Sequence, residues 1–303
     1  MRLVFAGTPA AAVPTLRALA ASEHEVVAVV TRSDAAVGRK RVLTSSPVAV
    51  AADELGLPVI KANRLDEEVT DAVAALAPDL GVIVAYGGLV RARLLAVPRL
   101  GWINLHFSLL PRWRGAAPVQ RALMAGEQRI GASVFQLVAA LDAGDVYAEL
   151  AEEVHGRTAG ELLEVLAVSG AELTTTVVDD LAAGRAAAVP QSGEVTLAPK
   201  LDIADGRIDW SQSSERVLAL VRGVTPEPGA STGHGDARLK VLALAPAEGA
   251  RSLDPGAVLL DAGRAVVGTG DGAVELVTVQ PAGKNPMPGA AWARGLRESA
   301  VLS

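Results

Sequence analysis

No cysteine occurs anywhere in the 303-residue sequence. This absence excludes disulfide bonds, thiolate metal ligands and a thiol nucleophile, and it fits a reducing compartment such as the cytoplasm. Aromatic residues make up only 3% of the chain, so the core must be built mainly from Ala, Val and Leu. No apolar run approaches the roughly 20 residues of a membrane span. The first residues turn at Gly7 and Pro9, unlike a signal peptide. We therefore expect a globular, cytoplasmic protein.

An excess of positive charge is also lacking, since the formal net charge is -6 at pH 7. The protein as a whole therefore exerts no field that attracts nucleic acid. One segment differs, because residues 35–52 contain Arg39, Lys40 and Arg41 and no acidic residue. This basic loop is either an ordinary solvated surface or a local nucleic-acid contact, and charge alone leaves both interpretations open.

Strand patterns and helix patterns alternate through the first half of the sequence. The strands are expected at residues 3–5, 26–31, 80–85, 103–107, 132–137 and 146–149, and the helices at 10–21, 47–55, 91–95 and 116–125. Such alternation is typical of βαβ units and predicts an α/β fold with a Rossmann-like, mostly parallel sheet. In sheets of this kind, ligands bind beyond the carboxyl ends of the strands.

The second half of the sequence has a different pattern. Thr158 and Glu161 have the spacing of a capping box, which predicts a long helix that closes near Gly184. After a stretch without periodicity, short apolar runs between Gly, Asp and Pro turns predict a smaller antiparallel, OB-like β-barrel. We therefore predict a first domain over residues 1–187, a linker over 188–207 and a C-terminal barrel-like domain over 208–303.

The densest run of unusual polar residues lies in the predicted strand at 103–107. Asn104 and His106 are two residues apart, so their side chains share one face of the strand. A preorganised amide donor aimed at a developing oxyanion lowers a barrier by about 3–4 kcal/mol. An imidazole can move a proton near neutral pH. The pair therefore suits acyl-group transfer, although a buried, hydrogen-bonded structural histidine is the alternative.

A second polar element is the run from Leu141 to Asp145, between two predicted strands. Asp and Gly are typical turn residues, and a turn alone accounts for this composition. A carboxylate at Asp142 can also orient a histidine and stabilise its charged form. Sequence alone leaves both interpretations open, because it does not bring Asp142 to His106.

These motifs together resemble the folate-dependent formyltransferases. The core of the resemblance is Asn104-Leu-His106, then Ser108-Leu-Leu-Pro111, then Leu141-Asp-Ala-Gly-Asp145. The fuller match is to the members that act on methionyl-tRNA, and it extends over essentially the whole chain. It includes residues 1–9 at the start, the active-site stretch 108–120, and residues 208–210 and 280–284 near the end. An ordered pattern of this length is far more specific than a lone Asn-x-His.

The resemblance implies a reaction and a set of site residues. The reaction would transfer a formyl group from 10-formyltetrahydrofolate to the amino group of initiator methionyl-tRNA, giving N-formylmethionyl-tRNA for translation initiation. The resemblance implies neither a metal nor a covalent enzyme intermediate, and we expect a monomer. The implied catalytic residues are Asn104, His106 and Asp142; the implied donor-binding residues are Ser108, Leu109, Leu110, Pro111, Ala85, Tyr86 and Gly87; and the implied tRNA-binding residues are Arg39, Lys40, Arg41 and Lys284.

Two other functions remain open at this point. The first is formyl transfer to a small nucleotide-linked amine, which the predicted C-terminal domain and the basic loop disfavour. The second is a dinucleotide-binding or non-enzymatic Rossmann-like protein. Residues 6–9 read Ala-Gly-Thr-Pro and lack the G-x-G-x-x-G spacing, which disfavours nicotinamide dinucleotides.

Overall fold

The protein was analysed as a computed structural model, which describes residues 1–38, 41–247, 249, 253–296 and 300–303. The chain divides into two compact units. The first comprises residues 1–118, 129–153 and 163–198, and the second comprises residues 119–128, 154–162 and 199–303. The boundaries predicted from the sequence were 1–187, 188–207 and 208–303. In the structure, residues 188–198 belong to the first unit, and residues 119–128 and 154–162 belong to the second.

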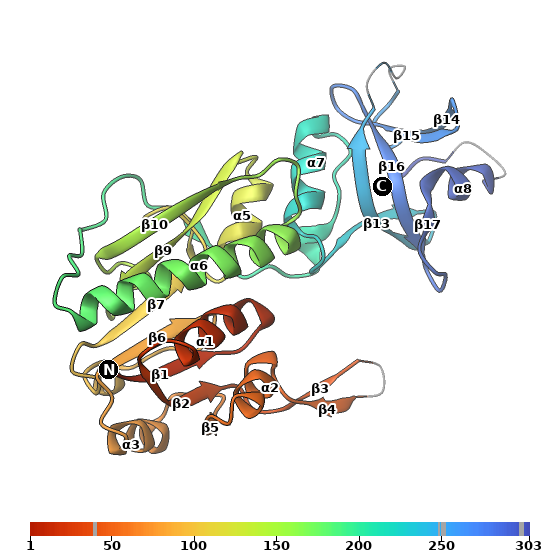
Figure 1. Cartoon of the computed structure of the whole chain (residues 1–303). Coiled ribbons are helices and arrows are strands. Elements are labelled where there is room, and N and C mark those ends of the chain that lie inside the picture. Colours follow the sequence, from red (N-terminus) through yellow and green to blue (C-terminus); the bar gives the residue numbers. More distant parts are fainter. Residues whose placement is uncertain (39–40, 248, 250–252, 297–299) are drawn as a thin grey trace. The chain divides into compact units, whose positions relative to one another are not determined.

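A seven-stranded, mostly parallel sheet forms the centre of the first unit (Figure 1). Its strands lie in the order β10-β9-β7-β6-β1-β2-β5, and β9 and β10 are antiparallel to their neighbours. The strand bounds are β1 Arg2–Gly7, β2 Glu25–Thr31, β5 Val59–Lys61, β6 Leu80–Val84, β7 Trp102–His106, β9 Arg129–Gln136 and β10 Val146–Glu153. The predicted Rossmann-like sheet is confirmed. Because β2 and β6 lie on opposite sides of β1, the chain reverses its direction of winding there, which is where such sheets bind ligands.

Two of the helices begin at the capping residues that the sequence indicated. The Ser46 hydroxyl accepts the N–H of Ala49, and Thr158 and Glu161 exchange the two bonds of a capping box. The helices of the first unit are α1 Val13–Ala20 (preceded by the 3-10 turn η1 Ala10–Ala12), α2 Pro47–Glu54, α3 Glu67–Ala75, α4 Ala92–Leu95 and most of α6 Ala159–Ala182, whereas α5 Pro118–Met124 belongs mainly to the second unit. The sequence interpretation missed α3. It is short, and it begins where the side chain of Asp66 caps Val69 N–H.

Both faces of the sheet are covered, which explains the continuous apolar strands. On one face, Trp102 packs with residues of α3 and α4, and its indole N–H donates to the carbonyl of Leu94. On the other face, α6 approaches β7 so closely at Gly170 that an added Cβ would lie 2.9 Å from a methyl group of Leu105. Asn104 and His106 alternate with Leu105, so they face away from α6.

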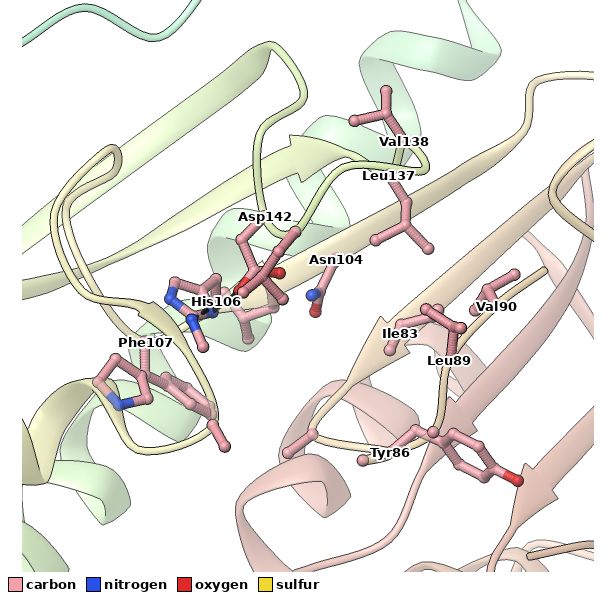
Figure 2. Close-up of a pocket in the computed structure, with 18 of the residues that line it drawn as sticks. Ile83, Tyr86, Leu89, Val90, Asn104, His106, Phe107, Leu137, Val138 and Asp142 are labelled. Carbon is pink, nitrogen blue, oxygen red and sulfur yellow. Dashed lines mark hydrogen bonds and ion pairs between the residues drawn. The ribbon is translucent and has the colours of Figure 1, made fainter. Parts of the chain in front are cut away.

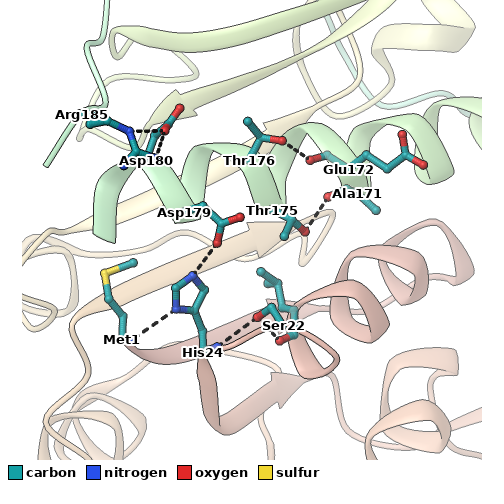
Figure 3. A network of polar contacts seen from close by, with 11 residues as sticks. Met1, Ser22, His24, Ala171, Glu172, Thr175, Thr176, Asp179, Asp180 and Arg185 are labelled. Carbon is teal, nitrogen blue, oxygen red and sulfur yellow. Dashed lines mark hydrogen bonds and ion pairs between the residues drawn. The ribbon is translucent and has the colours of Figure 1, made fainter. Parts of the chain in front are cut away.

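A polar network holds the C-terminal part of α6 against the first two strands (Figure 3). His24 precedes β2, and its Nε2 lies 2.9 Å from a carboxylate oxygen of Asp179 on α6. The other ring nitrogen of His24 lies 3.2 Å from the amino group of Met1. The side chain of His24 is almost fully buried, so this contact fixes the helix within the first unit.

Two small two-stranded sheets complete the first unit. The hairpin of β3 Ala35–Val37 and β4 Val42–Thr44 carries the predicted basic loop at its turn. A parallel pair joins β8 Arg114–Gly115 to β11 Leu197–Ala198, so part of the predicted linker is a strand partner of the stretch that follows His106.

The second unit is built on an antiparallel sheet with the order β12-β13-β16-β15-β14. The bounds in this unit are η2 Ala204–Gly206, α7 Ser214–Gly223, β12 Ala230–His234, β13 Ala237–Pro246, β14 Val258–Asp261, β15 Arg264–Gly268, β16 Ala273–Pro281, β17 Met287–Pro288 and α8 Gly289–Arg294. The predicted second domain of antiparallel strands is confirmed, and Figure 1 shows α7 and α8 beside its strands.

Residues 300–303 join the two edges of this antiparallel sheet. Ser303 exchanges two backbone hydrogen bonds with Gly233 of β12. Leu302 N–H donates to Gly256, and Val258 N–H donates to Ala300, just where β14 begins. The strands therefore close on themselves through the final residues, in the manner of a barrel. The side chain of Leu302 is buried in the core that Trp210 and Trp292 share.

Candidate active site

A cavity of about 440 Å³ opens in the first unit beyond the carboxyl ends of β1, β6 and β7. Figure 2 shows the side chains that line it, among them Asn104, His106 and Asp142. Its walls include the end of β7, residues 85–90 after β6 and residues 137–142 after β9, and Pro9, Gly115, Ala116 and Pro118 also line it. The catalytic residues implied by the resemblance therefore line one cavity, although they lie up to 38 positions apart in the chain.

His106 is buried at the end of β7, with its two ring nitrogens in different surroundings. Nε2 lies 2.9 Å from the carbonyl oxygen of Trp113, which can only accept, so Nε2 carries a proton. Nδ1 lies 3.9 Å from Oδ2 of Asp142, too far for a direct hydrogen bond. The ring meets Phe135 edge-on. In the neutral imidazole, Nδ1 is therefore the basic nitrogen, and it is the one that faces the carboxylate.

Burial lowers the pKa of His106 below its usual value near 6.5. The Asp142 carboxylate and the carbonyl of Trp113 oppose this effect, because both favour the charged ring. Burial prevails, so the ring is mainly neutral at pH 7. The site thus holds a base that is free to accept a proton, next to an anion that stabilises the product of that transfer.

The conformation of Asp142 depends on close backbone packing. Its φ is +44°, in the left-handed region that non-glycine residues rarely adopt. Its Oδ2 accepts a 2.8 Å hydrogen bond from the N–H of Gly115. Two residues later, Gly144 passes so close to β9 that an added Cβ would lie 1.7 Å from the carbonyl oxygen of Gln136. The turn interpretation and the functional interpretation of this run are therefore compatible.

Asn104 lies on the same face of β7 as His106 and lines the same cavity. Figure 2 shows its amide directed into the space beside His106 and Asp142. Among the described residues, its side chain has no hydrogen-bond partner. An amide that faces a cavity without an internal partner is available to a ligand.

Residues 85–87, implied as donor-binding, line the cavity through their main chain. The Tyr86 ring points away into the core, and its hydroxyl donates to the carbonyl of Ala62 at 2.6 Å. Arg32 donates to the carbonyls of Tyr86 and Gly87 and lies over the Tyr86 ring. The sequence interpretation missed Arg32, because it lies 54 positions from Tyr86 and carries no motif signal.

Residues 108–111, also implied as donor-binding, lie outside the cavity lining. The Ser108 hydroxyl donates to the carbonyl of Arg112. The hydroxyl of Ser133 on β9 donates to the carbonyl of Ser108 and accepts the N–H of Leu110. This loop supports the segment that carries Trp113, and direct contact between these residues and a donor stays a prediction.

Two of the four implied tRNA-binding residues, Arg41 and Lys284, lie in described parts of the chain, one in each unit. Arg39 and Lys40 fall outside the described residues. Arg41 is exposed beside the turn of the β3–β4 hairpin, with a φ of +50°. Lys284 is exposed in the turn after β16, where its carbonyl accepts the side chain of Gln280. Their part in tRNA binding stays a prediction.

Comparison with known proteins places this geometry in a family. The family model for the formyl transferase domain matches residues 1–178, and that for the formyl transferase C-terminal domain matches residues 200–297. The chain belongs to the formyl transferase family. The resemblance inferred from the sequence is thereby confirmed.

The similarity of this formyltransferase to individual proteins extends over its full length. It is 58% identical to the "Methionyl-tRNA formyltransferase" of Clavibacter sepedonicus over 305 residues, which cover 100% of both chains. The solved "Methionyl-tRNA formyltransferase from Clostridium thermocellum" has a TM-score of 0.60 at 16% identity, over 82% of this chain and 95% of that one. HypX from Aquifex aeolicus, solved with tetrahydrofolic acid, has a TM-score of 0.61 at 20% identity, over 96% of this chain and 46% of that one.

Two further observations concern the described residues of this formyltransferase. None of its helices is both long and apolar enough to cross a membrane within that part of the chain. The described His, Asp and Glu residues form no group of three that could hold a metal ion.

Proposed function

We propose that this formyltransferase transfers the formyl group of 10-formyltetrahydrofolate to the α-amine of initiator methionyl-tRNA, giving N-formylmethionyl-tRNA for translation initiation. Full-length identity of 58% to a relative named for this activity supports the proposal. The observation that carries the chemistry is the meeting of Asn104, His106 and Asp142 at one cavity. Tetrahydrofolate in a structural relative supports a reduced folate as the donor.

The cavity suits a flat heterocycle of folate size. Its volume of about 440 Å³ is within the range of small-molecule sites. Apolar side chains such as Ile83, Val90 and Leu137 form much of its lining. Residues 139–141 also line the cavity, and main-chain N–H and C=O groups there can bind the polar edge of a heterocycle.

The reacting groups act on the formyl carbon in a defined order. The amine attacks that carbon, and the developing oxyanion accepts a hydrogen bond from the Asn104 amide. Nδ1 of His106 takes the proton of the attacking amine and, once protonated, also faces the oxyanion. The C–N bond to the folate then breaks, and Nδ1 returns the proton to the departing nitrogen. Tetrahydrofolate leaves, and the formyl group remains on the methionyl amine.

Charge around His106 favours this proton transfer. Among the residues that line the cavity, Asp142 alone carries a charge. Its carboxylate stabilises the imidazolium that forms during the reaction. An amine on an esterified amino acid has a lowered pKa, so it supplies a free-amine fraction near pH 7 without a strong base. The neutral His106 is therefore basic enough for the task.

Basic residues would hold the tRNA. We assign this part to Arg39, Lys40 and Arg41, of which Arg41 is exposed in the first unit, and to the exposed Lys284 in the second. Each such contact releases counterions from the phosphate backbone and makes binding dependent on salt. The enzyme would act as a monomer in the cytoplasm, where its substrates occur.

A formylation assay tests this proposal directly. Wild-type enzyme with 10-formyltetrahydrofolate should formylate methionyl-tRNA, and free methionine or a nucleotide-linked amine should react far less. His106→Ala should lose about 100-fold or more of kcat while keeping its circular dichroism spectrum. Preferential reaction with a free amine would contradict methionyl-tRNA as the acceptor substrate. Undiminished turnover by His106→Ala would contradict the assigned chemistry.

A further inference from the structure

Residues 189–198, which the sequence indicated as a linker, bind tightly to the two loops of the site. Val189 and Val146 exchange backbone hydrogen bonds of 2.8 Å. At the other end of the segment, β11 pairs with β8, and the carbonyl of Ala198 accepts the N–H of Ala116. The segment therefore bridges the loop that follows His106 and the loop that carries Asp142.

Gln191 contacts both loops with a single amide group. Its Nε2 donates to the carbonyls of Asp142 and Gly144, at 2.8 Å each. Its Oε1 accepts from the guanidinium of Arg114, with a closest distance of 2.5 Å. Arg114 is the immediate neighbour of Gly115, whose N–H holds Oδ2 of Asp142. The side chain thus connects the main chain of Asp142 to the loop that fixes its carboxylate.

Thr196 makes a similar contact to the other strained residue of the site. Trp113 has a φ of +62°, and its carbonyl holds Nε2 of His106. The N–H of Trp113 donates to Oγ1 of Thr196 at 2.9 Å, and the carbonyl of Thr196 accepts the N–H of Arg114. Asp142 and Trp113 are both in the left-handed region, which non-glycine residues keep only where their surroundings impose it. One side chain of the segment holds each of them.

We propose that Gln191 and Thr196 are positioning residues, which set the distance between the Asp142 carboxylate and the His106 ring. Gln191 fixes the main chain of Asp142, and Thr196 fixes the carbonyl that orients His106. Neither side chain lines the cavity, so each acts through another residue. The inference deepens the proposed function and rests on it for the kinetic part of its test.

The position of Asp142 has a measurable effect on the His106 ring. The charged or titratable groups around the ring are Asp142 across the 3.9 Å gap, Tyr86 in the cavity wall with its hydroxyl turned to the core, and Arg112 and Arg114 beside Trp113. Because Asp142 raises the pKa of His106, a displaced carboxylate should lower that pKa further. A general loss of folded protein would reduce activity without changing the pKa of His106.

Full-length Gln191→Ala, Gln191→Glu and Thr196→Val enzymes test the proposal. Gln191→Glu keeps the size and the contact to Arg114, but it cannot donate to the two carbonyls. We expect kcat to fall about 10- to 100-fold in both Gln191 variants, with KM for each substrate nearly unchanged. NMR titration of the four histidine rings should show a lowered His106 pKa in Gln191→Ala and Thr196→Val, assigned by the signal missing in His106→Gln.

A surface glutamine provides the matched control. Gln128 is exposed and donates to one backbone carbonyl, that of Gly126, so Gln128→Ala should retain kcat and the His106 titration. In an Asp142→Asn background, Gln191→Ala should reduce kcat much less than it does in wild type, since Gln191 acts through the same carboxylate. The inference would be overturned if the losses of kcat in Asp142→Asn and Gln191→Ala were fully additive. It would also be overturned by an unchanged His106 pKa in Gln191→Ala, or by wild-type kinetics in Gln191→Glu. Inactive wild-type enzyme would overturn the proposed function, whereas the titration would still test the positioning.

Discussion

Oδ2 of Asp142 accepts a 2.8 Å hydrogen bond from the backbone N–H of Gly115. This bond holds the carboxylate 3.9 Å from Nδ1 of His106, near enough to stabilise a charged ring but too far to hold its proton. The histidine is therefore a neutral base before the reaction, and the nearby carboxylate stabilises its charged form once it has accepted a proton. A directly bonded carboxylate would instead favour the imidazolium before any substrate arrived.

Removal of that charge should weaken the base. In Asp142→Asn, we expect the pKa of His106 to fall, because burial would no longer be opposed by the carboxylate. Formylation kcat should fall about 10- to 100-fold, since the protonated ring is less stable during transfer. Histidine NMR and steady-state formylation measure the two effects. Asp145→Asn is the control, because Asp145 is an exposed residue of the same loop, and an equal loss there would contradict the assignment.

His106 should also make stability depend on pH. Its pKa is lower folded than unfolded, so the unfolded chain binds more protons below about pH 6.5. Its contribution to stability is therefore complete above that pH and is lost as the pH falls toward the folded pKa. The free energy of unfolding changes by at most about 1.4 kcal/mol per pH unit through this one group. The free energy of unfolding in urea should fall more steeply between pH 7 and pH 5 for wild type than for His106→Gln. Parallel pH profiles for the two proteins would refute the neutral buried ring.

The Asp142 loop should not tolerate a side chain at Gly144. A Cβ there would lie 1.7 Å from the carbonyl oxygen of Gln136, so Gly144→Ala must displace backbone. We expect a loss of about 2 kcal/mol or more in unfolding free energy, together with reduced kcat. Gly295→Ala, where the nearest atom lies 3.3 Å away, should cost much less. Thermal unfolding and formylation rates distinguish the two variants.

Two neighbouring residues test how the second unit closes. Leu302 is buried at 3% exposure and Val301 is 64% exposed, although both lie in the segment that joins the sheet edges. Leu302→Ala should cost about 2–5 kcal/mol of stability through loss of core packing. Val301→Ala should remain within about 0.5 kcal/mol of wild type. Equal effects in denaturant unfolding would mean that the segment adds backbone pairing only.

Salt should reveal a phosphate contact at the hairpin. Arg41→Ala should raise KM for tRNA, and the increase should be larger at low salt, where the released counterions favour binding most. The slope of log affinity against log salt should become shallower by about one. Arg185→Ala, whose arginine pairs with Asp180 on the surface, is the control. An unchanged salt slope for Arg41→Ala would contradict a phosphate contact there.

Much of this architecture was predictable, because it depends on side-chain pattern. The alternation of apolar strands gave the parallel sheet, and the hydroxyls of Ser46 and Thr158 marked helix starts that the structure confirms. The spacing of Asn104 and His106 correctly placed both on one face of a strand. These signals are local, so a short window of sequence contains them.

What was missed depends on main-chain groups or on distant partners. The carbonyl of Trp113 and the N–H of Gly115 would be present with almost any residue at those positions, so they leave no compositional trace. Gln191 lies 49 positions from Asp142, in a stretch whose Pro and Gly content indicated a linker. The strand β12 reads Ala-Ser-Thr-Gly-His and has no apolar alternation. Its pairing with the final residues could only be seen in three dimensions.

The closing role of residues 300–303 also affects how the second unit behaves when they are lost. Their backbone groups pair with both edges of the antiparallel sheet. Without them, β12 and the start of β14 would present unpaired edges, which attract other chains. Deletion of these four residues should therefore make the protein aggregate more readily.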